Sequence, residues 1–211
     1  MNIGIDIDDT ISNTFETFLP YMKKFIEQDL NRTLDLNLKS KTDYYNVIEK
    51  YGISEDEARM FWVKYYVSIL ESVEPKKSSV EVIKNLKENG NKIFLITARF
   101  DDGIVDVRAI TEKWLEKNNI KYDKLIINSQ NKLEIAKQEE IDLFIDDSIR
   151  NCEMISSGNI KTYMMITENN KYYEKNNCSY FITCSLSFIL CLLQKSSCTL
   201  RCSGIIQIKD A

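Results

Sequence analysis

The chain has 211 residues, of which 44% are hydrophobic and 28% are charged, and it contains six glycines and two prolines. This composition is ordinary for a soluble globular protein with one core, or with one core and a small inserted domain, and it excludes a fibrous or disordered chain. The formal net charge is −4 and no dense run of Lys and Arg occurs, which argues against binding to nucleic acid.

The absence of histidine restricts the chemistry further. It excludes Ser-His-Asp and Cys-His catalysis and every metal site built on imidazole, so acid–base catalysis must come from Asp, Glu, Lys, Tyr or Cys. The six cysteines fit no zinc-binding spacing, and we interpret them as free thiols. The N-terminal residues MNIGIDIDD lack the features of a signal peptide, which favours a cytoplasmic location.

The first predicted element is a buried strand over residues 2–8, an apolar run that ends in the carboxylates Asp6 and Asp8. Residues 11–30 then place apolar side chains at helical spacing, which predicts a helix. Pro20 predicts a kink or a break within that helix, because proline removes a backbone hydrogen bond.

A second helical segment follows a polar, weakly patterned stretch at residues 31–50. Ser54 and Glu57 form a capping-box signature, which predicts the start of a helix that extends to about residue 71. Residues 11–75 therefore read as a helical insertion, and they hold 11 of the 22 aromatic residues of the chain. Most of these aromatic side chains are expected to form the core of the insertion, and a few to line a pocket.

After Pro75 the pattern alternates regularly between strands and helices. Strands are predicted at residues 92–97, 124–128, 141–146 and 161–166, and helices at residues 79–88, 105–118, 131–138 and 148–156. This alternation predicts an α/β core with a parallel sheet that helices cover on both faces. The core would comprise residues 1–10 and 76–211, and the insertion residues 11–75.

The C-terminal tail differs in composition from the rest of the chain. Residues 178–211 hold five of the six cysteines and four charged residues, and residues 176–194 carry no charge. A membrane anchor is one interpretation, but the stretch is short and interrupted by Ser, Thr, Asn and Cys. A buried last strand and helix is the preferred interpretation, and the translation of a shifted reading frame stays open as a third.

Two clusters of carboxylates follow two of the predicted strands. Asp6, Asp8 and Asp9 follow the first strand, and Asp146 and Asp147 follow the strand at 141–146. Ligand sites of parallel α/β sheets lie at the carboxyl ends of the strands, so we expect the two clusters to converge there. Converging carboxylates without histidine suit Mg²⁺, whereas either pair alone would be explained as ordinary helix capping.

Two further segments could hold phosphate at the same edge. The strand at 92–97 ends at Thr97, and Arg99 follows two residues later, where a hydroxyl and backbone N–H groups can bind phosphate oxygens. Lys132 starts a short predicted helix 14 residues before Asp146, and could neutralise charge on a transferring phosphoryl group. Taken alone, Thr97 would be an ordinary cap and Lys132 a surface residue.

In chain order, the motifs DIDDT (6–10), ITAR (96–99), NK (131–132) and FIDDS (144–148) resemble the four motifs of the haloacid-dehalogenase-like (HAD) phosphatase superfamily. The match covers residues 1–167, and the paired motifs DxDxT and DD are the specific part of it. The segments IGIDIDDTI, TDYYNV, FLITAR and NKLEIAKQEEIDLFIDDS resemble the 5'(3')-deoxyribonucleotidase-like branch, the cytosolic type C 5'-nucleotidases. Residues 178–211 do not resemble the C-terminal segment of that family.

The resemblance implies a Rossmann-like three-layer core with a small α-helical cap inserted after the first strand. It implies that Asp6 is the nucleophile and forms an aspartyl-phosphate, while Asp8 acts as the general acid and then the base. Burial near other acids is expected to raise the pKa of Asp8. By the same resemblance, Thr97, Lys132 and Arg99 would contact phosphate, and Asp6, Asp8, Asp146 and Asp147 would hold Mg²⁺, Asp8 through its backbone carbonyl.

The substrate expected from this resemblance is a small phosphorylated metabolite, not a nucleic acid or a membrane. Hydrolysis of (deoxy)nucleoside monophosphates is the first hypothesis, and one or two of five candidate side chains are expected to stack on the base: Phe15, Phe18, Tyr44, Tyr45 and Trp62. A phosphatase for a sugar phosphate or another metabolite is the second hypothesis, since the cap decides the substrate. A non-catalytic binding module on the same fold is the third, and a homodimer stays open.

Overall fold

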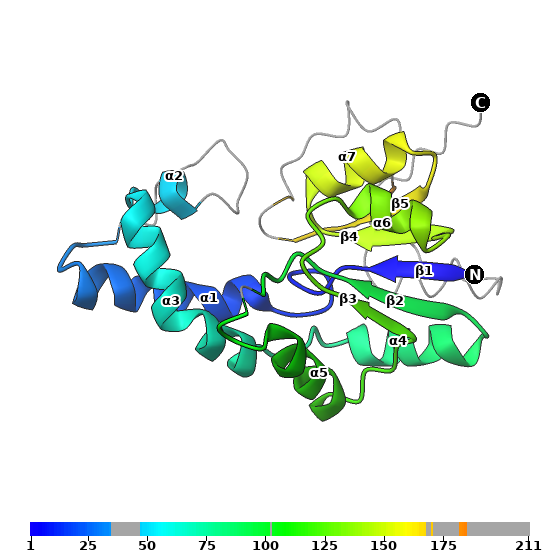
Figure 1. The fold of residues 1–211 in the computed structure, drawn as a ribbon, viewed down its shortest axis with the longest axis horizontal. Coiled ribbons are helices and arrows are strands. Elements are labelled where there is room, and N and C mark those ends of the chain that lie inside the picture. Colours follow the sequence, from blue (N-terminus) through cyan, green and yellow to red (C-terminus); the bar gives the residue numbers. More distant parts are fainter. Residues whose placement is uncertain (35–46, 102, 168–169, 171–181, 185–211) are drawn as a thin grey trace.

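A computed structural model describes residues 1–34, 47–101, 103–167, 170 and 182–184 (Figure 1). It contains one six-stranded sheet in the order β3-β2-β1-β4-β5-β6, and every neighbouring pair is parallel. The strands are β1 (Asn2–Ile5), β2 (Lys92–Ile96), β3 (Lys124–Ile126), β4 (Leu143–Asp146), β5 (Lys161–Met165) and β6 (Ile182–Cys184). The predicted α/β class with a parallel sheet is confirmed.

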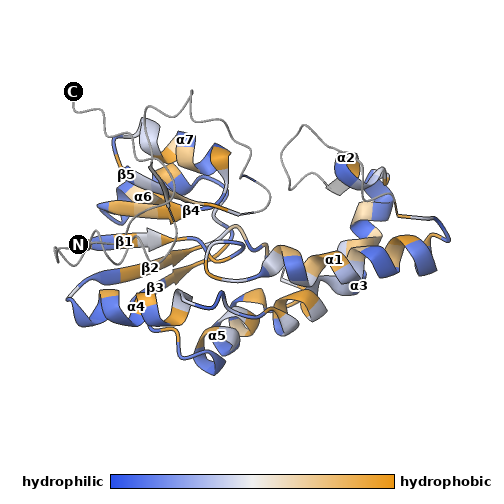
Figure 2. Cartoon of the chain, turned by 180° about the vertical axis from the view of Figure 1, so that it is seen from behind, coloured by the Kyte–Doolittle hydropathy of each residue, from blue (hydrophilic) through white to orange (hydrophobic). Residues whose placement is uncertain are grey.

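Helices cover both faces of this sheet. They are α4 (Ser79–Glu88), α5 (Val107–Lys117), α6 (Lys132–Gln138) and α7 (Ile149–Ser157). Helices α4 and α5 lie on one face, and α6 and α7 lie on the other (Figure 1). In Figure 2 the strands are mostly hydrophobic, and each of these helices carries both hydrophobic and hydrophilic residues. The hydrophobic side of each helix can therefore pack on the sheet while the hydrophilic side faces solvent.

Strand alternation divides the core into two layers. Ile3 and Ile5 of β1 pack with α4 and α5, whereas Phe144 of β4 packs with α6 and α7. Gly4 lies opposite Phe144, and a Cβ atom at Gly4 would come within 2.7 Å of the Phe144 ring. A glycine is therefore required at the centre of the sheet, because the aromatic ring occupies the space of a side chain.

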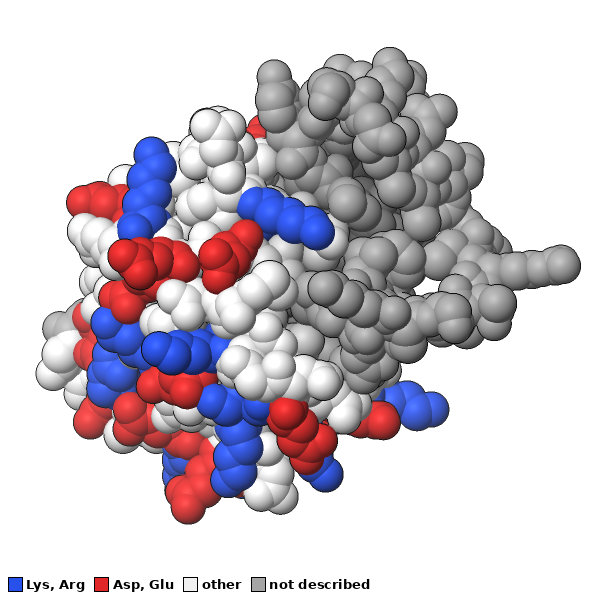
Figure 3. All heavy atoms as spheres, turned by 90° about the vertical axis from the view of Figure 1, so that its right-hand side faces the viewer, with Lys and Arg blue, Asp and Glu red and all other residues white. Residues whose placement is uncertain are grey.

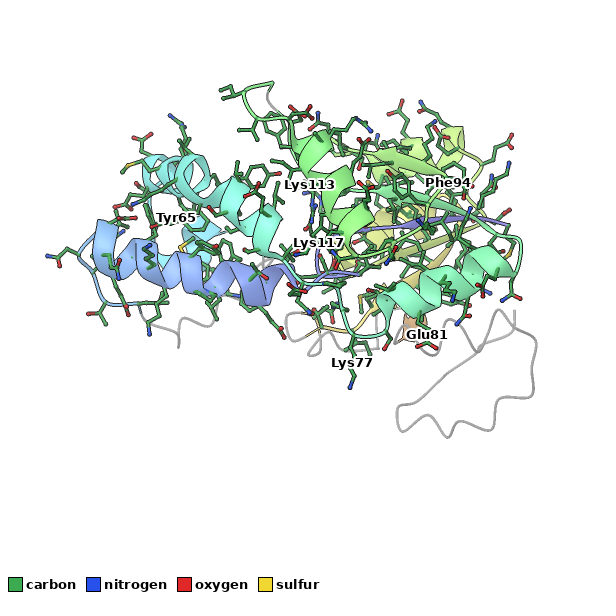
Figure 4. All side chains as sticks on the ribbon, turned by 90° about the horizontal axis from the view of Figure 1, so that it is seen from below. Tyr65, Lys77, Glu81, Phe94, Lys113 and Lys117 are labelled. Atoms are coloured by element: carbon green, nitrogen blue, oxygen red, sulfur yellow. The ribbon has the colours of Figure 1, made fainter. Side chains whose placement is uncertain are left out.

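The helices that follow β1 and precede α4 form a second unit beyond the carboxyl edge of the sheet (Figure 1). They are α1 (Thr14–Lys24), the π-helical turn η1 (Phe25–Asp29), α2 (Val47–Tyr51) and α3 (Glu55–Ser72). Aromatic side chains form the core of this unit, and Phe61 lies edge-to-face with Phe18 at 5.2 Å and with Phe25 at 5.5 Å. Tyr65 points inward between α1 and α3, whereas Lys77 points away from the protein (Figure 4).

The predicted helix starts and ends are partly correct. The capping box at α3 is confirmed, since the Glu57 backbone N–H donates to Ser54 Oγ at 3.2 Å and the Ser54 N–H donates to Glu57 Oε2 at 2.8 Å. The predicted break at Pro20 is wrong, because α1 continues through Pro20 to Lys24 and then widens into the π-helical turn. Packing of its buried face against α3 holds the helix together across the missing hydrogen bond.

The first strand ends earlier than residue 8. Regular pairing stops at Ile5, and the chain then turns so that the backbone N–H groups of Ile11 and Ser12 both donate to the Ile7 carbonyl. Asp9 adopts a positive φ of 55° in this turn, and its carboxylate accepts the Phe15 N–H at 2.9 Å. Asp9 therefore has the capping role considered from the sequence, at the start of α1.

The two connections between the sheet and the helical unit lie side by side. Ser12 forms an antiparallel bridge with Pro75, the Asn13 N–H donates to the Glu74 carbonyl at 2.9 Å, and the Lys76 N–H donates to the Ile11 carbonyl at 2.8 Å. The chain thus leaves the core and returns to it at one place.

Cys152 is a thiol rather than half of a disulfide, as predicted, and its buried Sγ donates to the Asp146 carbonyl at 3.5 Å. The preferred interpretation of the tail included a last strand, and β6 supplies a short one beside β5. The rest of residues 178–211 and its remaining thiols lie outside the described residues. Among the described helices, none is long and apolar enough to cross a membrane.

Charged side chains of both signs are mixed on the described part of the face that Figure 3 shows. Ion pairs on the surface of the core include Lys87 with Asp123, at 2.7 Å. Exposed pairs of this kind contribute little to stability.

Candidate active site

The carboxyl ends of the central strands place the motif residues in one site. Asp6 follows β1, Thr97 follows β2, and Asp146 is the last residue of β4. Because β1 lies between β2 and β4, these three side chains start from adjacent strands. The predicted convergence of the two carboxylate clusters is confirmed for Asp6, Asp146 and Asp147, whereas Asp8 pairs with Arg99 and Asp9 caps α1.

An acidic cluster occupies the centre of the site. Asp6, Asp146 and Asp147 each offer an oxygen atom, these atoms lie within 4.8 Å of one another, and all three residues are buried. Thr10 Oγ1 donates a hydrogen bond of 3.3 Å to Asp147 Oδ1. Three buried carboxylates at this separation repel one another, and a bound cation would reduce this repulsion. Their oxygen atoms could hold a metal ion.

Lys132 neutralises part of this charge. Its Nζ lies 2.7 Å from Asp6 Oδ1 and 2.7 Å from Asp146 Oδ2, and the residue is only 2% exposed. Burial alone would lower the pKa of Lys132, but the charges of Asp146 and Asp6 outweigh it and raise that pKa. The alternative of an exposed surface lysine is therefore wrong, because α6 directs this side chain inward between the two carboxylates.

The pKa of Asp6 is raised to about 7. Burial is the largest cause and the charges of Asp146 and Asp8 add to it, while the charge and hydrogen bond of Lys132 oppose the shift. A cation bound beside Asp6 would favour its ionised form.

Asp146 already has donors at both of its oxygens. Oδ2 accepts from Lys132, Oδ1 accepts from the Ser148 backbone N–H at 2.8 Å, and Asn151 Nδ2 lies 3.2 and 3.1 Å from the two oxygens. These bonds orient Asp146 as the support of Lys132. Of the two adjacent aspartates, Asp147 is the better candidate for direct contact with a metal ion.

Asp8 lies apart from the acidic cluster and forms an ion pair with Arg99. Arg99 Nε lies 3.2 and 3.0 Å from the two Asp8 oxygens, and Nη2 lies 2.9 Å from Oδ1. Arg99 is 4% exposed, its Nη1 donates to Thr111 Oγ1 at 3.2 Å, and its guanidinium lies over the Trp114 ring at 5.6 Å. This arginine is therefore held in the core and directed at Asp8.

The pair changes the expected protonation of Asp8. Burial would raise the pKa of Asp8, but the charge and hydrogen bonds of Arg99 outweigh burial and lower it, with help from the Thr14 hydroxyl at 2.7 Å. The prediction of a raised pKa is wrong, because it considered the acidic neighbours and not the arginine at the end of the adjacent strand.

Thr97 lies between these groups and is fully buried. Its Oγ1 donates to Asp8 Oδ2 at 3.3 Å and accepts the Arg99 backbone N–H at 3.2 Å, and its carbonyl accepts from Ser129 Oγ at 2.6 Å. The hydroxyl bond to Asp8 is long, so Thr97 can turn this hydroxyl toward a bound phosphate.

A pocket of about 430 Å³ lies between the site and the helical unit. Phe15, Phe18 and Trp62 line it, as predicted, although Phe18 is also part of the aromatic core of the helical unit. Tyr44 and Tyr45 lie outside the described residues. The pocket has the size of a site for a small organic ligand.

The sequence analysis missed several residues that line this pocket: Thr14, Tyr66, Gln130, Arg150 and Asn151. Tyr66 could have been found, since it lies four residues after Trp62 on the same face of a helix. Its hydroxyl accepts the Phe100 N–H at 3.1 Å and so joins α3 to the loop that follows β2. The others are single polar residues in loops and first turns, where no pattern marks them.

The chain has the fold of the haloacid-dehalogenase-like hydrolases. A solved hydrolase of the haloacid-dehalogenase-like family from Streptococcus pneumoniae superposes with a TM-score of 0.65 at 10% identity, covering 92% of this chain and 98% of that one. A structure described as a phosphatase from Clostridium difficile gives a TM-score of 0.70 at 14% identity, covering 92% and 99%. The fold that the resemblance of the four motifs implies is confirmed.

The names of the curated relatives are more specific than those of the solved structures. A nucleotidase from Clostridium acetobutylicum is 28% identical over 176 residues, or 83% of each chain. A protein from Bacillus subtilis with a provisional nucleotidase name is 29% identical over 165 residues, 74% of this chain and 75% of that protein. No family model matches the chain. The relatives and the fold together support an enzyme of the phosphatase class.

Proposed function

We propose that the protein is a Mg²⁺-dependent phosphomonoesterase that dephosphorylates (deoxy)nucleoside monophosphates through an aspartyl-phosphate on Asp6. The observation that carries this proposal is Lys132, which is buried between Asp6 and Asp146 beneath a pocket with an aromatic wall. A buried lysine between two strand-end carboxylates serves no surface role, and it suits a site that accumulates negative charge during the reaction.

Asp6 is the proposed nucleophile. Lys132 contacts Oδ1, and no other described side chain bonds to the Asp6 carboxylate. One oxygen would attack phosphorus while the bond from phosphorus to the ester oxygen breaks and the alcohol leaves. Water would then attack the phosphorus of the aspartyl-phosphate, which releases phosphate and restores the Asp6 carboxylate.

Asp8 is the proposed proton carrier for both steps. It would protonate the leaving oxygen in the first step and take a proton from the attacking water in the second. The Arg99 pair favours the carboxylate form, which suits the second step. For the first step, the negative charge of a bound phosphoryl group would raise the pKa of Asp8 and favour its protonated form.

The donor set fits Mg²⁺. Asp6 and Asp147 offer carboxylate oxygens, Asp8 would add its backbone carbonyl, and hard oxygen ligands without nitrogen or sulfur match this ion. A bound Mg²⁺ would neutralise charge on the phosphoryl oxygens and orient the group for attack. Lys132 and the Thr97 hydroxyl would hold the remaining phosphoryl oxygens.

The helical unit is proposed as a cap over residues 11–75 that contacts the substrate beyond its phosphate. Phe15 is half-buried and Trp62 is exposed at the pocket, and both offer aromatic surface for a nucleobase. The nucleotidase names of the relatives from Clostridium and Bacillus support this choice of substrate.

Phosphate release from a panel of deoxyribonucleoside monophosphates, ribonucleoside monophosphates and sugar phosphates tests the proposal. Each substrate is assayed with Mg²⁺ and with EDTA, using the wild type and the Asp6→Asn variant. The matched control is Asp56→Asn, since Asp56 is an exposed carboxylate on the helical unit. We expect Mg²⁺-dependent release of phosphate from nucleotides that Asp6→Asn abolishes and Asp56→Asn leaves unchanged.

Faster release from a sugar phosphate than from any nucleotide would overturn the substrate assignment. Full activity of Asp6→Asn, or full activity in EDTA, would overturn the mechanism.

A further inference from the structure

The pocket has two chemically different walls. The wall from the helical unit is apolar and aromatic, and includes Phe15 and Trp62. The wall from the core is polar, and comes from the loop that carries Gln130 and from the first turn of α7, which carries Arg150 and Asn151. A ligand that fills the pocket must therefore present both an apolar and a polar side.

Arg150 differs from the other cations that line this pocket. Arg99 is paired with Asp8, and Lys132 is paired with Asp6 and Asp146. Within the described part of the chain, Arg150 makes no hydrogen bond and no ion pair. None of the described residues accepts from its five N–H donors, and an arginine presents them in a geometry that matches an anionic oxygen group.

Arg150 lies closer to the protein surface than the groups that would act on the transferred phosphoryl group. The groups that would act on that phosphoryl group, Asp6, Thr97 and Lys132, are at most 5% exposed and lie at the bottom of the site. Arg150 is exposed at the rim. Because the scissile phosphate must reach Asp6, the rim faces the part of the substrate that lies beyond it.

The first turn of α7 holds Arg150 in a fixed place. Ser148 caps the helix by accepting the Asn151 N–H at 3.4 Å, and Asn151 Nδ2 bonds to the buried Asp146. The backbone around Arg150 is thus tied to the acidic cluster, so this side chain starts from a fixed place at the rim of the pocket.

We propose that Arg150 binds a second anionic group of the substrate, so that the enzyme prefers nucleotides that carry a further phosphate over the corresponding monophosphates. This inference rests on the proposed function, because it takes the phosphoryl group bound at Asp6 as its reference point. The second group stays bound while the first is hydrolysed, and Arg150 takes no part in bond making or breaking.

The test compares deoxythymidine 5'-monophosphate with deoxythymidine 3',5'-bisphosphate, which differ by one phosphate. The readout is kcat/KM for removal of the 5'-phosphate in the presence of Mg²⁺, with the product identified as deoxythymidine from the monophosphate and as deoxythymidine 3'-monophosphate from the bisphosphate. We expect the wild type to favour the bisphosphate by about tenfold or more, the scale of one charge-assisted Arg–phosphate contact. We expect Arg150→Gln to lose this preference, and Arg150→Lys to retain part of it because the charge remains.

The matched control is Arg59→Gln, because Arg59 is exposed on α3 and pairs only with Asp56 among the described residues. It should leave the preference unchanged. Equal activity of the wild type on both compounds would overturn the inference. An equal loss on both compounds in Arg150→Gln would also overturn it, because Arg150 would then contact the shared part of the substrate.

Calorimetric titration of both compounds into Asp6→Asn protein separates the two proposals. If the wild type hydrolyses neither compound, the proposed function fails, yet tighter binding of the bisphosphate that Arg150→Gln removes in this background would still support the role of Arg150. Equal binding of both compounds would overturn that role whatever the activity.

Discussion

Mg²⁺ is expected to stabilise the protein by an amount that depends on pH, because Asp6 must be ionised to bind the cation. Burial raises the pKa of Asp6 from its ordinary value of 3.8 to about 7. Between these two values the folded protein keeps a proton on Asp6 that the unfolded chain releases. Without a cation, Asp6 therefore makes the free energy of unfolding fall as the pH rises from about 4 to about 7.

The size of the Mg²⁺ effect follows from this pKa. At about pH 8 the carboxylate is ionised, and Mg²⁺ at about 100 times its dissociation constant would add about 2.7 kcal/mol to the free energy of unfolding. At about pH 5.5, protonation of Asp6 weakens binding roughly 30-fold, which leaves about 1 kcal/mol. For a chain of this length the increase in Tm would be about 5–10 °C at the higher pH and about 2–4 °C at the lower.

Scanning calorimetry with Mg²⁺ and with EDTA at both pH values measures these shifts. Asp6→Asn removes the charge at nearly constant size and should abolish most of the increase at the higher pH, whereas the exposed control Asp56→Asn should behave as the wild type. An equal increase in Tm at both pH values would refute the reasoning about Asp6. So would an undiminished increase in Asp6→Asn.

Three further outcomes are expected. Arg99→Gln removes the charge that lowers the pKa of Asp8, so the basic limb of the profile of kcat/KM against pH, where Asp8 loses the proton that the first step needs, should move to higher pH; an unmoved limb would contradict this. Gly4→Ala places a methyl group against the Phe144 ring and should lower the free energy of unfolding by about 1–3 kcal/mol in urea denaturation, and no loss would show that the ring can shift. Ser54→Ala should cost about 1 kcal/mol in the same assay, since it removes the capping box of α3, and should leave kcat unaltered.

Much of the fold could be predicted because local patterns and tertiary packing agree. The strands of the core are short apolar runs, and several helices start at a side-chain cap such as Ser54, so the elements are found to within a few residues. The π-helical turn that follows α1 could not be found this way. The turn depends on how α1 packs on α3. Pro20 taken alone predicts a kink or a break in the helix, not its continuation into a wider turn.

The candidate site was also predictable only in part from the sequence. Topology brings strand ends together, so Asp6, Thr97 and Asp146 could be placed in one site from the chain order of their strands. The pairing of Asp8 with Arg99 spans 91 residues and depends on side-chain direction, which no spacing in the sequence records. The same reason explains why Arg150 was missed.

The paired connections at Ile11–Asn13 and Glu74–Lys76 have a consequence for the evolution and engineering of the protein. Since the Lys76 N–H already bonds to the Ile11 carbonyl, a short turn could close the core where the helical unit now departs. A helical unit of another length or sequence could be grafted at the same two points without moving the strand ends that carry Asp6 and Asp146. Substrate range could thus diversify by exchange of one contiguous segment while the machinery for cleaving the phosphate ester is inherited intact.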